Sequence, residues 1–172
     1  MTNNPQMAKP NYLNRVRTIA YWLFTILVSF EMVAGSIWDL LKIEYVRTVL
    51  SQLGYPIYVC IVIGVWKFPC ALTLMMPRFQ RLKEWAYAGA FFNYWGAFLS
   101  HILVGGGTKR VIAPLILAIF TLASWALRPP SRRLEPASAA VTNVREWVAP
   151  AIALAVMAAV SFLTMPKGPP AA

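Results

Sequence analysis

The chain has 172 residues, of which 59% are hydrophobic and 13% are charged, with a mean hydropathy of +0.57 and a net charge of +10. Soluble domains are typically about 45–50% apolar and about 25% charged, so this composition excludes an ordinary soluble protein and predicts a small membrane protein of one domain. The positive charge does not indicate nucleic-acid binding. The basic residues fall in short segments between apolar runs and form no continuous basic surface.

Four apolar runs are long enough to cross a membrane as helices, which requires about 20 residues each. The runs cover residues 18–37, 56–76, 85–104 and 111–127. A cleaved signal peptide is the rival interpretation of the first run, but its apolar character continues on both sides of Glu31, so we expect a retained span. The triple glycine at 105–107 predicts a tight reversal of the chain. The sequence therefore predicts an all-α membrane protein whose residues 18–128 form a four-helix transmembrane bundle.

The composition changes after the fourth run. Residues 129–148 are polar and small, and predict an exposed connector. Residues 149–165 are apolar and rich in alanine, at about the lower length limit for a span. We predict a fifth, C-terminal transmembrane helix there, with a helix lying at the membrane interface as the alternative. Residues 1–17 and 166–172 are expected to be a cytoplasmic segment and a tail.

The distribution of lysine and arginine predicts the orientation. Ten of these residues lie in the N-terminal segment and in the second and fourth connections, and five lie on the opposite side. Cytoplasmic loops carry the excess of positive charge in membrane proteins. We therefore expect a multi-pass protein with a cytoplasmic N-terminus.

Two ionisable residues, Glu31 and Lys67, lie inside predicted spans. A charge near the bilayer centre costs at least about 2.5–3.5 kcal/mol on insertion scales, so it normally faces the protein interior with a partner. We predict that these two residues form a buried ion pair. With a rise of 1.5 Å per residue, Asn93 and His101 are expected at graded depths in the same bundle.

These residues define a candidate buried polar site for a small apolar molecule with polar ends, such as a quinone. The alternative is that the same groups only fix the register of the helices. No spacing of histidine, cysteine and acidic residues predicts a metal site, and no residue is assigned a catalytic role. The six candidate site residues are Glu31, Lys67, Asn93, His101, Trp66 and Trp95.

Several short segments carry a family resemblance. They are LGYP at 53–56, GVWK at 64–67, KEWAYAG at 83–89, and SH at 100–101 before the glycine turn. Over residues 16–128 the sequence resembles the DoxX-like family of small bacterial integral membrane proteins. The family is named after a subunit of an archaeal thiosulfate:quinone oxidoreductase. The resemblance implies a four-helix bundle in the bacterial inner membrane.

The resemblance also implies a function. It favours a membrane subunit or anchor of a quinone-linked redox assembly, surrounded by lipid and by other membrane or redox subunits, and not a stand-alone enzyme. The alternative function is a structural or assembly protein without catalytic activity. A solute carrier is disfavoured, because the sequence has no inverted repeat and no pair of broken helices.

Overall fold

The structure is all-helical over the residues that it describes. This computed structural model describes residues 12–134 and eight single positions in the C-terminal segment: 148, 151, 152, 155, 156, 159, 160 and 163. The elements are α1 (Tyr12–Leu41), α2 (Glu44–Gln52), α3 (Tyr58–Met75), α4 (Gln80–Leu103), α5 (Thr108–Leu127) and a single 3-10 turn, η1 (Pro130–Arg132). The predicted all-α fold is confirmed. Most of the predicted fifth helix, 149–165, lies outside the described residues.

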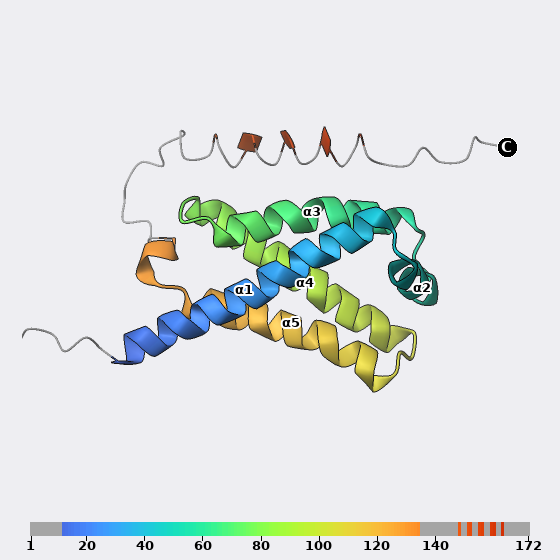
Figure 1. Ribbon diagram of the computed structural model, residues 1–172, viewed down its shortest axis with the longest axis horizontal. Coiled ribbons are helices and arrows are strands. Elements are labelled where there is room, and N and C mark those ends of the chain that lie inside the picture. Colours follow the sequence, from blue (N-terminus) through green and yellow to red (C-terminus); the bar gives the residue numbers. More distant parts are fainter. Residues whose placement is uncertain are drawn as a thin grey trace, which may run out of the picture.

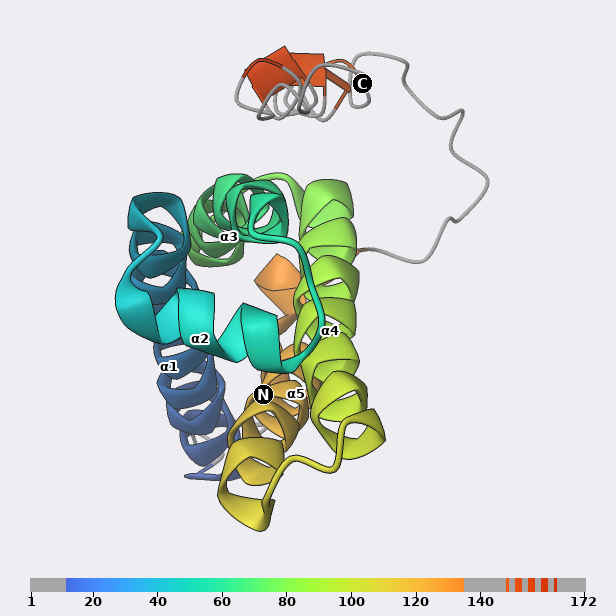
Figure 2. The same cartoon turned by 90° about the vertical axis from the view of Figure 1, so that its right-hand side faces the viewer.

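Four of the helices form an antiparallel bundle (Figure 1). Helix α1 packs against α3 and α5, and α4 packs against α5 and α3, so that each helix has two neighbours. The contact between α3 and α4 is the least extensive of the four. The short helix α2 lies across one end of the bundle (Figure 2).

Small residues set the distance between α1 and α3. A Cβ atom added to Gly64 would lie 3.0 Å from the Cβ of Asp39 and 3.0 Å from the Cγ of Leu40. The Ser36 hydroxyl on α1 donates a 2.7 Å hydrogen bond to the Gly64 carbonyl on α3. All four helices contribute to one buried core, which consists of Val28, Met32, Ala71, Leu74, Tyr87, Ala90, Tyr94 and Ala118.

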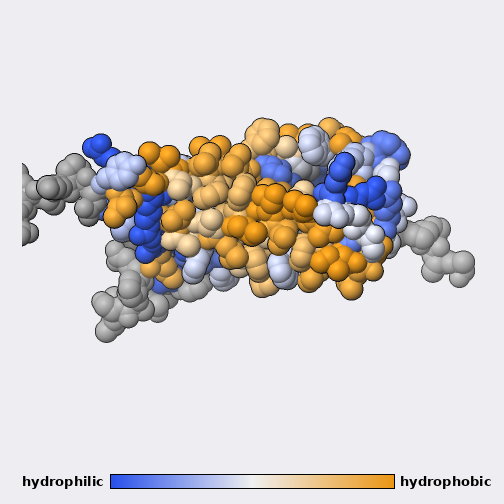
Figure 3. Space-filling view, turned by 90° about the horizontal axis from the view of Figure 1, so that it is seen from below, coloured by the Kyte–Doolittle hydropathy of each residue, from blue (hydrophilic) through white to orange (hydrophobic). Residues whose placement is uncertain are grey.

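On the face seen in Figure 3, the surface of the bundle is mostly apolar between two hydrophilic ends. Among the described residues, three helices are long and apolar enough to cross a membrane: α1, α3 and α5. The predicted span 85–104 is helical as part of α4, but this helix is not as apolar as those three. Its glycine, tyrosine, tryptophan and polar residues lower its mean hydropathy. The structure thus supports three of the four predicted bundle spans.

A glycine turn between α4 and α5 and the short helix α2 complete the fold. Gly105 has a φ of +68°, a conformation that glycine adopts without strain, so the predicted reversal at 105–107 is confirmed. Helix α2 was not predicted from the sequence. Its Val46 and Leu50 are buried against α3, where they pack with Cys60 and Ile61. This amphipathic pattern places one face of α2 on the bundle.

Candidate functional site

A cavity of about 370 Å³ lies between α3 and α4. Three of the predicted site residues line it: Trp66 and Lys67 from α3, and Asn93 from α4. The remaining wall is mostly apolar and consists of Met32, Val62, Ile63, Pro69, Cys70, Thr73, Leu82, Trp85, Ala86 and Gly89. Pockets for small molecules have volumes of about 300–1,000 Å³ and mostly apolar walls with a few polar groups. The cavity fits this description.

Lys67, in the wall of this cavity, forms an ion pair. The Lys67 ammonium is 3.0 Å from an Asp39 carboxylate oxygen, and the two side chains are 14% and 12% exposed. The pair joins α3 to α1. Both charges are therefore largely removed from solvent. Loss of one partner would leave the other as an uncompensated buried charge.

Glu31 lies beside this pair. A Cβ atom added to Gly35 would be 3.0 Å from Glu31 Oε1 and 3.0 Å from Lys67 Nζ, so the carboxylate and the ammonium both lie next to this glycine. The other carboxylate oxygen of Glu31 accepts a hydrogen bond from the hydroxyl of Tyr94. Glu31, Gly35 and Asp39 are spaced by four residues, which puts them on one face of α1.

These contacts correct the prediction that Glu31 and Lys67 form an ion pair. Lys67 pairs with Asp39, and Glu31 binds Tyr94. Sequence reasoning missed Asp39 because it ended the first span at residue 37, whereas α1 continues to Leu41. The sequence did offer one signal, because the spacing of Asp39 from Glu31 puts both carboxylates on the same face of a helix. Tyr94 follows Asn93 directly and gave no such signal.

The structure does not bring two predicted site residues, Trp95 and His101, to the cavity. The ring of Trp95 stacks on Phe91, with centroids 5.8 Å apart, and contacts Phe98. His101 lies in the last turn of α4, where its carbonyl accepts a hydrogen bond from Gly106 N. Within the described residues, no group of three or more histidine, cysteine or acidic side chains could hold a metal ion.

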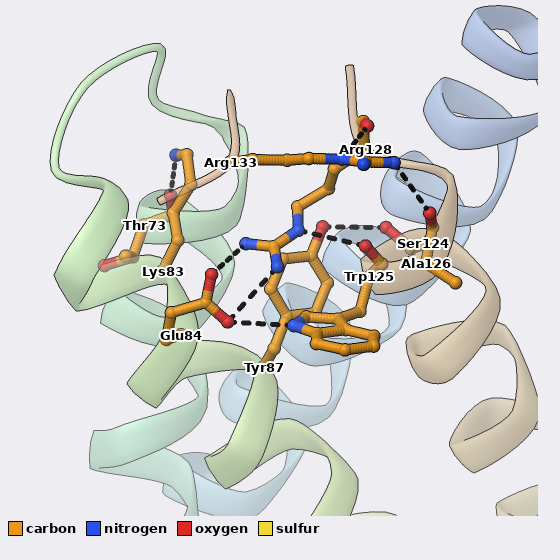
Figure 4. Close-up of polar contacts among 9 residues, drawn as sticks. All are labelled: Thr73, Lys83, Glu84, Tyr87, Ser124, Trp125, Ala126, Arg128 and Arg133. Atoms are coloured by element: carbon orange, nitrogen blue, oxygen red, sulfur yellow. Dashed lines mark hydrogen bonds and ion pairs between the residues drawn. The ribbon is translucent and has the colours of Figure 1, made fainter. Parts of the chain in front are cut away.

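A second polar cluster lies at the end of the bundle where α4 begins and α5 ends (Figure 4). Arg128 binds the Glu84 carboxylate through two nitrogens, at 2.6 and 3.2 Å, and the indole of Trp125 donates to the same carboxylate at 2.8 Å. The Arg128 guanidinium also lies 5.0 Å from the centre of the Tyr87 ring. These contacts join the beginning of α4 to the last turn of α5 and to Arg128, which follows it.

The pKa of Glu84, which precedes the predicted span 85–104, reflects this cluster. Burial raises the pKa of Glu84, but the hydrogen bonds from Arg128 and Trp125 and the charge of Arg128 outweigh burial and lower it below its ordinary value. The neighbouring Lys83 is fully buried and donates to the carbonyls of Thr73, at 2.6 Å, and Met76. Burial and the nearby charges of Arg132 and Arg128 lower the pKa of Lys83 to about 8.

These features define a small helical membrane protein with a buried ion pair beside an apolar cavity. The chain belongs to the DoxX-like family, whose profile matches residues 23–124. The matched region contains α2, α3 and α4 whole and most of α1 and α5, and it includes every residue of the cavity wall. No curated protein and no solved structure matches the chain.

Proposed function

We propose that this protein is a membrane subunit or anchor of a quinone-linked redox assembly, and that the cavity between α3 and α4 holds the quinone ring. The observation that carries the proposal is the composition of the cavity wall, in which Lys67 and Asn93 are polar and nearly all the rest is apolar. A quinone has the matching chemistry, since it is a flat apolar ring with two carbonyl oxygens that accept hydrogen bonds.

The residues of the cavity have distinct roles in this proposal. The ammonium of Lys67 has three N–H donors, and Asp39 leaves donors for one quinone carbonyl. The amide of Asn93 donates to the same ring from α4. The side chains of Trp66 and Met32 contact the apolar part of the ring. Because Asp39 compensates the charge of Lys67 and Glu31 does not line the cavity, a neutral ligand meets no uncompensated charge in the cavity wall.

The experiment that tests the proposal measures the quinone bound to the purified protein and compares the unmodified protein with a variant substituted at Gly89. A Cβ atom added to Gly89 meets no atom within 4 Å, and this residue lines the cavity. Gly89→Leu is therefore expected to fill the cavity without disturbing the bundle, and to lower the bound quinone at least tenfold. The measurement is extraction and chromatography of quinone after purification in mild detergent.

Gly96 provides a matched control. It lies two helical turns further along α4, on the same face, and an added Cβ atom there also meets nothing within 4 Å, but Gly96 does not line the cavity. Gly96→Leu is expected to retain the quinone of the unmodified protein. Absence of quinone from the unmodified protein, or equal loss in both variants, would refute the proposal.

A structural role is the second candidate, and the pattern of polar contacts favours it. Several hydrogen bonds join neighbouring helices and would hold their register whether or not a ligand binds. Thr25 on α1 and Tyr87 on α4 both bind the Ser124 hydroxyl on α5, at 2.7 and 2.8 Å. A protein that retains its stability and its partners without any bound quinone would support this role.

The proposal includes a bacterial inner-membrane location, four bundle spans and a cytoplasmic N-terminus. The cytoplasmic N-terminus is supported by the ten lysines and arginines predicted on one side of the membrane against five on the other. A reporter fused after Arg133 is expected to be cytoplasmic, and one inserted at 105–107 to be external. Activity of the two reporters on the same side would show that α5, the helix between the two positions, does not cross the membrane.

A further inference from the structure

One end of the bundle carries positive charge that is not balanced by acidic residues. This is the end where α1 and α4 begin and α3 and α5 end. Among the described residues at this end, Glu84 is the single acid, and Arg128 occupies it. The basic residues there are Arg15, Arg17, Arg78, Arg81, Lys83, Arg128, Arg132 and Arg133. An anion would be strongly attracted to this end.

Two of these arginines converge on one neutral oxygen. A terminal nitrogen of Arg17 and a terminal nitrogen of Arg133 each donate to the carbonyl of Ala126, both at 3.2 Å. The contact of Arg133 is drawn in Figure 4. The Nε of Arg17 is buried and has no hydrogen-bond partner in the described part of the chain. The two guanidinium groups thus meet at one carbonyl oxygen, and no carboxylate of residues 12–134 forms an ion pair with either of them.

Two neighbouring cations, Arg132 and Arg128, already have several contacts. Arg132 donates to the carbonyls of Leu74, Met75 and Met76, at 3.2–3.4 Å, and its guanidinium lies 4.4 Å from the centre of the Trp22 ring. Arg128 forms an ion pair with the Glu84 carboxylate. Among the described residues, Arg17 and Arg133 have only neutral oxygens as partners, as Arg132 does. They differ from it because they meet at one shared carbonyl oxygen and because the buried Nε of Arg17 has no hydrogen-bond partner in that part of the chain.

The position of the pair indicates the ligand. Arg17 directly precedes the predicted apolar run 18–37, and Arg133 follows η1 after the end of α5, so both lie at the level of the lipid headgroups. Guanidinium groups bind phosphate oxygens through two parallel hydrogen bonds. Basic groups beside a membrane span attract anionic lipids. We propose that Arg17 and Arg133 bind the phosphate group of an anionic lipid headgroup. This inference is independent of the quinone proposal.

Native mass spectrometry of the whole protein, taken from bilayers of phosphatidylglycerol and phosphatidylcholine, tests the proposal. The unmodified protein is expected to retain phosphatidylglycerol selectively. Arg17→Gln and Arg133→Gln should each lower the bound phosphatidylglycerol about fivefold, the equivalent of about 1 kcal/mol for one basic group near the membrane surface. Equal retention of the two lipids by the unmodified protein would overturn the proposal without the use of any variant.

Arg47 supplies the matched control, since it also donates to a backbone carbonyl, that of Lys42, but lies at the opposite end of the bundle. Arg47→Gln should retain the lipid of the unmodified protein, and Arg17→Lys should keep part of it because the charge remains. Titration of the detergent-solubilised protein with inorganic phosphate distinguishes the sources of the phosphate group. Saturable binding of inorganic phosphate without retention of phosphatidylglycerol would overturn the assignment to a lipid.

Discussion

Replacing Lys67 with methionine lowers the free energy of unfolding of the bundle by about 3–5 kcal/mol, because it leaves the buried Asp39 carboxylate without its counter-charge. Asp39→Asn has a similar cost, since it leaves the ammonium unpaired. The double variant recovers much of the loss, because replacing both members of a buried pair by neutral groups is often close to neutral. Unfolding in mixed micelles with increasing denaturing detergent measures all three values.

Glu31 supplies the control for this cycle. It lies near Lys67, next to Gly35, but binds Tyr94, so Glu31→Gln combined with Lys67→Met should show a smaller coupling energy than the pair with Asp39. Additive losses for Asp39→Asn and Lys67→Met would mean that these charges do not interact. A larger coupling of Lys67 with Glu31 than with Asp39 would restore the ion pair that the sequence predicted.

Gly64→Ala is expected to destabilise the bundle by about 1–3 kcal/mol, the usual cost of overpacking a tight contact. The added methyl group would meet the Cβ of Asp39 and the Cγ of Leu40 at 3.0 Å, and the first of these atoms is attached directly to the backbone of α1. Helices α1 and α3 must then separate, which also lengthens the hydrogen bond from Ser36 to the Gly64 carbonyl. The same unfolding assay measures the effect.

Gly96→Ala on α4 is the matched control for this substitution, because its added methyl group meets nothing within 4 Å. It should leave stability unchanged or raise it by up to about 1 kcal/mol, since alanine favours helix more than glycine does. Equal effects of the two substitutions would show that helix propensity, and not the contact between α1 and α3, determines the result.

The helical fold was predictable because the signals for it are strong and local. The apolar runs, the glycine turn and the charges of Glu31 and Lys67 stand out within short windows of sequence. Helix α2 was missed because its nine residues are mostly polar, and only Val46 and Leu50 are buried. The ends of α1 were also misjudged, since polar residues near the ends of the run resemble a connection although the helix continues through them.

The candidate site was only partly predictable, because depth in the membrane does not fix direction around a helix. Asn93 and Trp95 are two residues apart, which is about 200° around the axis, so both cannot line the same cavity. His101 is eight residues beyond Asn93, about 12 Å along the helix. Trp66 and Lys67 do line the cavity. To predict that Asp39 is the partner of Lys67, one has to know where α1 ends and how closely α1 approaches α3.

The contacts of Arg132 have a consequence for biosynthesis. The last carbonyls of α3, at Leu74 and Met75, accept hydrogen bonds from a side chain that follows α5 in the sequence. During translation, α3 emerges more than fifty residues before this arginine. The C-terminal end of α3 therefore stays incompletely bonded while α4 and α5 are made, and it is completed only after the last bundle helix has left the ribosome.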